Sequence, residues 1–363
     1  APMNYFGQHL TALAYGTGAR FIVGCVLVSL GILLAAGGGS WDITNHLLNK
    51  PETFFAPPHA ILYTGAGTAV VGAALLFFAS RSLGKVVWSA KLAVAGVALL
   101  VSAGPVDFAW HTAFGLDGLL SPPHFVLVSG MVLSSLGALA GMVHYNRMKV
   151  RRGEPVRLHI VFIVIGILPL WLSLSGMIDM FTLPFSNTAY FNFDPDRTFA
   201  VAFASVGFPF LIAACLCTAS VLAGRRFGAL SITGGAFVLT SILTSIIPSE
   251  ELWPTIQFYM LNIIPIVAMD AILSYRYWRP FRIPLYAAGA VAGLTFFMLY
   301  FPLITHTYNE FTHYGRLVWP SVTAAIYFEE MAIAYPYVAA PAASMGVLGA
   351  LAADRLAGRN KDL

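Results

Sequence analysis

Apolar runs that are long enough to cross a lipid bilayer recur along almost the whole chain. A transmembrane helix needs about 20 apolar residues, whereas a buried strand of a soluble protein needs only about four to eight. Hydrophobic residues make up 58% of the sequence and charged residues only 10%, far below the roughly 25% charged content of soluble domains. The sequence therefore predicts an all-α, polytopic membrane protein and argues against a soluble α/β enzyme.

We expect about ten transmembrane helices in one bundle. The predicted spans are residues 21–40, 60–80, 87–106, 124–145, 158–178, 197–223, 228–248, 255–274, 283–303 and 331–353. The last span contains Pro336 and Pro341, so we expect it to begin late or to be broken.

Lysines and arginines are concentrated in alternate loops. They occupy the loops after the second, fourth, sixth and eighth spans and the end of the chain, whereas the other loops hold only Lys50, Arg197 and Arg316. By the positive-inside rule, both termini are expected in the cytoplasm and the acidic loops in the periplasm or outside the cell. No basic cluster is interleaved with aromatic residues, so we expect no nucleic-acid partner.

An internal repeat relates two segments of the first half of the chain. Each contains an aspartate, a histidine four residues later and, after twelve further residues, a second histidine that follows two prolines. The first metal segment, residues 42–65, holds Asp42, His46 and His59, and the second metal segment, residues 107–130, holds Asp107, His111 and His124. We therefore expect duplicated two-helix units over residues 1–150 and further helices of the same bundle over residues 151–363. A faded third copy, which has Asp179 but no histidine, is expected to be structural.

The residue types of the two metal segments are those of a transition-metal site. An aspartate and a histidine four residues apart share one face of a helix, and a twelve-residue connection is long enough to bring the next histidine back to them. Two imidazoles and a carboxylate suit copper, iron or zinc and suit magnesium or calcium poorly. The alternative is that these side chains only cap helix ends, but a cap requires one side chain and each segment repeats three. We predict that all six residues bind metal, at one site or two.

The two segments resemble the copper motifs in the membrane C subunit of the particulate methane and ammonia monooxygenases. That family carries an Asp-x3-His-x12-His motif and, about seventy residues later, an Asn-x3-His-x13-His motif, each with a proline shortly before the last histidine. By this resemblance, the first metal segment matches the first motif and the second metal segment matches the second. The resemblance covers about residues 25–150. Asp107 stands where the family has asparagine, and the last interval of the second segment is one residue shorter.

The resemblance implies a copper-dependent monooxygenase component that acts with dioxygen on a small apolar substrate. It also implies partners: other membrane subunits and a cupredoxin-like protein, or further copies of this chain. The sequence contains no flavin, haem or nicotinamide motif, so electrons are expected from a partner. The alternatives are a copper or zinc transporter, which would also need His and Asp, and a membrane hydrolase that uses a metal-bound hydroxide.

Other ionisable residues leave two interpretations open. His306, Glu310 and His313 follow the ninth span and suit either a further ligand cluster or interfacial polar side chains. Asp270 near the inner end of the eighth span suits either a proton relay or a side chain that reaches the membrane surface. The three cysteines lie within apolar runs and are expected to be buried, small hydrophobic residues: Cys25, Cys215 and Cys217.

Overall fold

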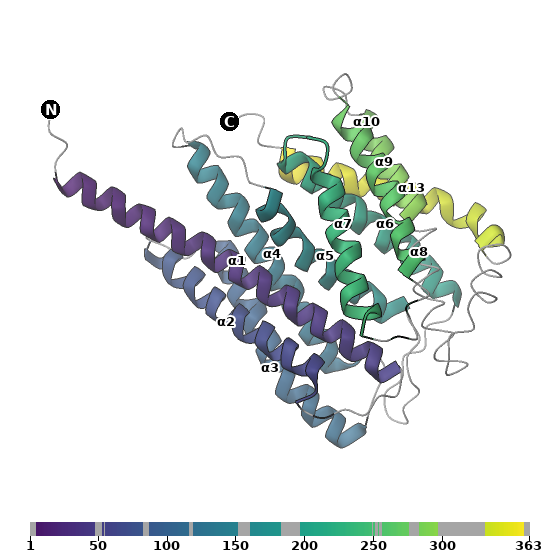
Figure 1. Cartoon of the computed structure of the whole chain (residues 1–363), viewed down its shortest axis with the longest axis horizontal. Helices are drawn as coiled ribbons and strands as arrows, with labels where there is room; N and C mark the ends of the chain where they lie inside the picture. Colours follow the sequence, from purple (N-terminus) through teal and green to yellow (C-terminus); the bar gives the residue numbers. More distant parts are fainter. Residues whose placement is uncertain are drawn as a thin grey trace.

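The fold is a bundle of α-helices (Figure 1). The computed structural model describes residues 5–47, 53, 55–82, 87–115, 119–151, 160–182, 197–248, 250, 253, 256–275, 283–296 and 331–358. Within these ranges there is no β-strand. The elements are α1 (Tyr5–Leu47), α2 (Pro57–Ser82), α3 (Trp88–Phe114), α4 (Pro122–Arg151), α5 (Ile160–Thr182), α6 (Arg197–Leu222), α7 (Ala229–Ser241), η1 (Ile242–Ile246), α8 (Ile256–Leu261), α9 (Ile263–Ser274), α10 (Ile283–Val291), η4 (Ala292–Phe296) and α13 (Met331–Gly358).

Seven of the described helices are long and apolar enough to cross a bilayer. They are Thr17–Asn45, Pro57–Ser82, Trp88–Phe114, Pro122–Asn146, Ile160–Thr182, Ala202–Leu222 and Tyr335–Leu356. Three shorter apolar helices lie within the remaining predicted spans: Ala229–Thr244, Tyr259–Ser274 and Ile283–Thr295. The prediction of an all-α membrane-spanning bundle of about ten helices is therefore confirmed, and the chain is an integral membrane protein.

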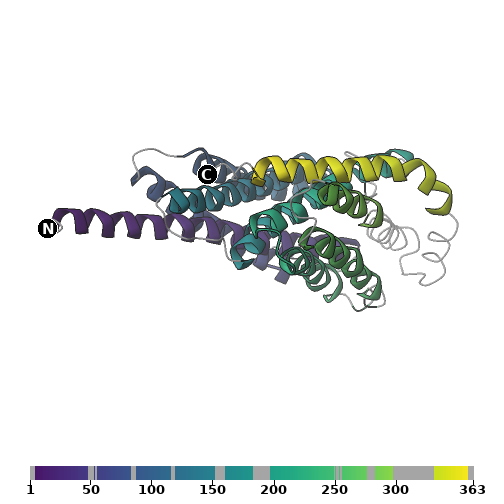
Figure 2. The same ribbon diagram turned by 90° about the horizontal axis from the view of Figure 1, so that it is seen from above.

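The last span differs from the expectation of a late start or a break. It forms one helix, α13, which continues through Pro336 and Pro341. Transmembrane helices tolerate proline because neighbouring groups can satisfy the carbonyl that loses its partner. This helix packs on α6 and α10 and lies along one side of the bundle in Figure 2.

The repeat seen in the sequence extends through the packing of the helices. In the α1–α2 pair, a Cβ atom added to Gly31 would lie 2.5 Å from the backbone nitrogen of Ala69. In the α3–α4 pair, a Cβ atom added to Gly96 would lie 2.4 Å from that of Ser134. These positions are offset by 65 residues, as are the two metal segments. Both pairs thus bring their backbones together at equivalent glycines, in the manner of small-residue interfaces in membranes.

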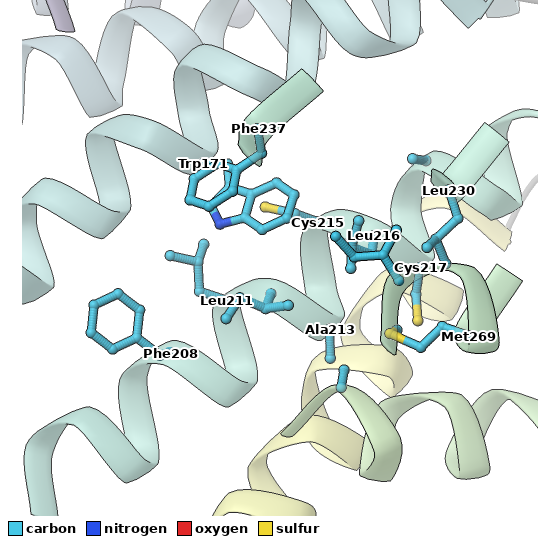
Figure 3. Packing of buried hydrophobic residues seen from close by; sticks show 14 of the residues in the cluster. Trp171, Phe208, Leu211, Ala213, Cys215, Leu216, Cys217, Leu230, Phe237 and Met269 are labelled. Atoms are coloured by element: carbon cyan, nitrogen blue, oxygen red, sulfur yellow. The ribbon is translucent and has the colours of Figure 1, made fainter. Parts of the chain in front are cut away.

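The largest hydrophobic cluster lies in the second half of the chain. Figure 3 shows its centre, where Trp171 of α5 stacks on Phe237 of α7 with ring centroids 4.0 Å apart. Leu33 and Ile43 of α1 pack against the same cluster, so α1 contacts both halves of the chain. The three cysteines are buried and not in disulfides, as the sequence predicted.

The sequence left the role of Asp270 open, and the structure shows the hydrogen bonds that surround its carboxylate. Its carboxylate is fully buried, and Oδ2 accepts hydrogen bonds from Gly228 N (2.8 Å), Ser231 N (2.9 Å) and Ser231 Oγ (2.7 Å). The carboxylate therefore caps the amino-terminal end of α7 from the neighbouring helix α9, where the helix dipole favours a negative charge.

Candidate metal centre

The second metal segment brings its three predicted ligands together. Asp107 and His111 lie near the end of α3, and His124 lies in the first turn of α4. Oδ1 of Asp107 lies 3.5 Å from Nε2 of His111 and 3.2 Å from Nε2 of His124. One ligand atom from each of the three residues lies within 4.8 Å of the others. The side chains are between 22% and 24% exposed, so they are partly shielded from solvent.

Backbone carbonyls determine which ring nitrogen of each histidine carries the hydrogen. Nδ1 of His111 lies 3.2 Å from the carbonyl oxygen of Gly115, and Nδ1 of His124 lies 3.2 Å from that of Leu119. A carbonyl oxygen can only accept a hydrogen bond, so in both rings Nδ1 is the donor. In the neutral ring, Nε2 then presents a lone pair, and both Nε2 atoms face Oδ1 of Asp107. Metal-binding histidines are usually held in this way.

This arrangement fits a bound metal ion. In the neutral tautomers, the two Nε2 lone pairs and the carboxylate oxygen are all acceptors, and a cation between them would satisfy all three. A single proton would satisfy one Nε2–Oδ1 contact, whereas a metal ion satisfies all three ligands. Ligands about 2.0–2.1 Å from a tetrahedral ion are about 3.3 Å apart, close to the observed 3.2 and 3.5 Å.

The first metal segment repeats the same geometry with two of its residues. Nε2 of His59 lies 2.9 Å from Oδ1 of Asp42, and Nδ1 of His59 lies 3.0 Å from the carbonyl oxygen of Thr53. The backbone of His46 lies in α1 one turn after Asp42, but its side chain lies outside the described part of the structure. The pair Asp42 and His59 is therefore brought together, while the participation of His46 stays a prediction.

Local backbone structure explains how the histidines are positioned. The prolines before His59 and His124 begin α2 and α4, and proline suits the first helical turn because its missing N–H has no partner there. Gly115 follows α3 with a φ of 77°, a conformation that L-residues rarely adopt. This turn directs the Gly115 carbonyl back to the ring of His111.

Both metal segments border one partly open cavity of about 200 Å³. Asp42 comes from the first segment, and Asp107 and His124 come from the second. The walls are completed by α5 and by the end of α7 with η1. The two candidate centres therefore share one space, which the sequence spacing could not reveal.

Asp179 of α5 also lines this cavity. The sequence suggested only a structural role for it, since the faded third copy has no histidine. The available signal was its position at the end of the fifth span, which corresponds to the positions of Asp42 and Asp107 at the ends of the first and third spans. Ser175, one turn earlier on α5, lines the cavity as well and had no signal in the sequence.

One further predicted ligand cluster cannot be placed in the structure. His306, Glu310 and His313 lie outside the described residues, so their two interpretations stay open.

The chain was also compared with known proteins. No family model, curated protein or solved structure matches it. The chain is thus characterised by its fold and by its Asp/His centre: it is an integral membrane helical bundle with a potential metal-binding triad.

Proposed function

We propose that this protein is a copper-binding membrane oxidoreductase component, related in function to the C subunit of copper membrane monooxygenases. The observation that carries the proposal is the convergence of Asp107, His111 and His124, with both imidazole Nδ1 atoms bound to backbone carbonyls. A copper ion bound there would supply the one-electron chemistry that activates dioxygen. Asp42 and His59, with His46 as the expected third ligand, form the second centre.

The residues around the centre support a role with a small apolar substrate. The carbonyls of Gly115 and Leu119 hold the two rings in one tautomer and orientation, which keeps the Nε2 atoms directed at the ion. The cavity beside the ligands has apolar walls that include Leu127 and Met131, and such walls admit an apolar molecule and exclude water. Electrons and the remaining subunits, including a cupredoxin-like protein, are expected from partners.

The centre is proposed to face the periplasm or the cell exterior. The carboxyl-terminal ends of α1 and α3 lie at the opposite end of the bundle from the start of α1 and the end of α13 (Figure 1). The loops within the two metal segments are also loops with few cations. The ligands would then receive metal from the side opposite to the cytoplasm.

Metal analysis of the purified full-length protein tests the proposal. We expect bound copper at up to two ions per chain and, for the cupric form, an electron paramagnetic resonance spectrum with nitrogen hyperfine coupling from imidazole. Membranes that contain the protein and its partners should consume dioxygen when a short hydrocarbon is added.

Three outcomes would overturn the proposal. Zinc without copper would favour the hydrolase, because zinc activates water and has no redox chemistry. Metal-dependent uptake into vesicles that contain only this chain would favour the transporter. Protein that stays free of metal after incubation with copper, iron and zinc would exclude the metal centre altogether.

A further inference from the structure

The shared cavity has the size of a small organic molecule. Its volume is about 200 Å³, somewhat larger than the roughly 150 Å³ apolar cavity that binds benzene in an engineered protein. Most of its wall is apolar and includes Ile43, Leu62, Leu127, Met131 and Leu172.

Two polar atoms on the α5 side of this wall have no hydrogen-bond partner among the described residues. Ser175 is 5% exposed, and both its Oγ and Oδ1 of Asp179 are buried without a hydrogen bond. The two residues are four positions apart on α5 and so share one face of the helix. A buried polar atom without a hydrogen-bond partner destabilises the folded protein. A bound ligand that supplies the missing hydrogen bonds would remove that cost.

Three other hydroxyl groups of the cavity already donate to carbonyl oxygens within their own helices. Ser173 donates to Pro169 O at 2.6 Å, Ser241 donates to Phe237 O at 3.0 Å, and Thr244 donates to Thr240 O at 2.8 Å. The unmet hydrogen-bonding capacity of the α5 wall is therefore concentrated at Ser175 and Asp179.

We propose that this cavity binds a small neutral alcohol, with its hydroxyl group between Ser175 and Asp179 and its apolar part toward His124. A hydroxyl group both donates and accepts, which matches a carboxylate oxygen and a serine hydroxyl. An anion is disfavoured because the described wall contains three aspartates and no lysine or arginine. A cationic ligand is disfavoured only under the proposed function, because metal ions bound at the edge of the cavity would repel a cation inside it. Under the proposed function, in which a short hydrocarbon is the substrate, an alcohol of this kind belongs to the class of the product.

Binding of three probes of similar shape to the purified full-length protein tests this inference. Benzyl alcohol carries the hydroxyl group, toluene lacks it, and benzylamine is a cation at neutral pH. We expect benzyl alcohol to bind about tenfold more tightly than toluene, the effect of about one hydrogen bond, and more tightly than benzylamine. Saturation-transfer NMR with competition gives the relative affinities.

Variants of α5 distinguish the loss of a hydrogen bond to the ligand hydroxyl from a change in the shape or folding of the cavity. Ser175→Ala should weaken benzyl alcohol about tenfold and leave toluene unchanged. Ser173→Ala is the matched control, because its hydroxyl lines the same cavity but already bonds to Pro169 O, and it should change neither. Gly176→Leu should abolish binding of both probes, since a Cβ atom there meets nothing within 4 Å and the side chain would extend into the cavity.

Metal content, measured on every variant, distinguishes failure of this inference from failure of the metal centre. Equal affinities for benzyl alcohol and toluene, or an unchanged affinity in Ser175→Ala, would refute the hydroxyl site even if copper is bound. Preference for benzylamine would identify a cation site instead. If the purified chain holds no metal, the proposed function fails, while the comparison of benzyl alcohol with toluene still decides whether the cavity receives a hydroxyl group.

Discussion

At the scale of single residues, the described histidines of the two metal segments share one pattern of contacts at their ring nitrogens. His59, His111 and His124 each direct Nδ1 to a carbonyl oxygen and Nε2 to an aspartate oxygen. The carbonyl fixes the orientation of the ring before any metal binds, so little side-chain freedom remains to be lost on binding.

A substitution at Gly115 tests whether the carbonyl contact positions the ring of His111, and it leaves all candidate ligands in place. Gly115→Ala should weaken metal binding at the second metal segment by about 10–100-fold, because an L-residue disfavours the φ of 77° that directs the carbonyl to His111. Gly104→Ala within α3 is the control, since its Cβ would meet nothing within 4 Å. Metal titration of both variants measures the difference. An unchanged affinity in Gly115→Ala would mean that the carbonyl does not position the ring.

Replacement of a ligand tests whether the two centres bind metal independently. His111→Ala should remove about half of the bound metal, because the Asp107 cluster uses no residue of the first metal segment. Thr112→Ala is a matched control, since this neighbouring hydroxyl is exposed and bonds to Phe108 O in its own helix. Metal content per chain is the measurement. Loss of all metal in His111→Ala would show that the two segments form one binuclear centre across the shared cavity.

At the scale of elements, one buried carboxylate on α9 accepts hydrogen bonds from the first turn of α7. Asp270→Ala should lower the free energy of unfolding by about 2–3 kcal/mol, because the hydrogen bonds from Gly228 N, Ser231 N and Ser231 Oγ would lose their acceptor. Thermal unfolding in detergent measures the change, with Ser274→Ala at a half-buried position of the same helix as control. A role of Asp270 as a proton relay would instead predict normal stability with loss of activity.

The close approach of α1 and α2 makes a second prediction at this scale. Gly65→Ala should destabilise the protein by about 1–3 kcal/mol or more, because its Cβ would lie 2.5 Å from the backbone nitrogen of Ala35. Gly67→Ala, two residues further on the exposed side of α2, meets nothing within 4 Å and should be neutral or slightly stabilising. Equal stability of the two variants would show that this pair of helices can separate without cost.

At the scale of the whole molecule, the orientation of the bundle in the membrane can be tested at the two ends of α2. A cysteine at the exposed Thr53 should react with an impermeant thiol reagent added to intact cells, and a cysteine at the exposed Ser82 should react only after lysis. The native cysteines are buried, so the unmodified chain serves as the control for background labelling. The opposite pattern would place the metal segments on the cytoplasmic side.

The sequence by itself determined the class of the fold and the identity of the candidate ligands. Span length and composition predict the helices because the thickness of the bilayer imposes one length on every crossing. The spacing of Asp107, His111 and His124 predicts their convergence, because one helix turn and one hairpin connection relate them and both are local in the chain. The same reasoning predicted the pairing of Asp42 with His59, which the structure also contains.

Only the tertiary structure decided which distant residues share a site. Asp179 and Ser175 enter the cavity because α5 packs against α1 and α4, and no sequence interval encodes that contact. Likewise, Asp270 caps α7 across 39 to 42 residues of chain, so the sequence alone could not distinguish a cap from a relay. The physical reason is that local spacing is set by the geometry of one helix or hairpin. The juxtaposition of separate helices depends instead on how all side chains pack at once.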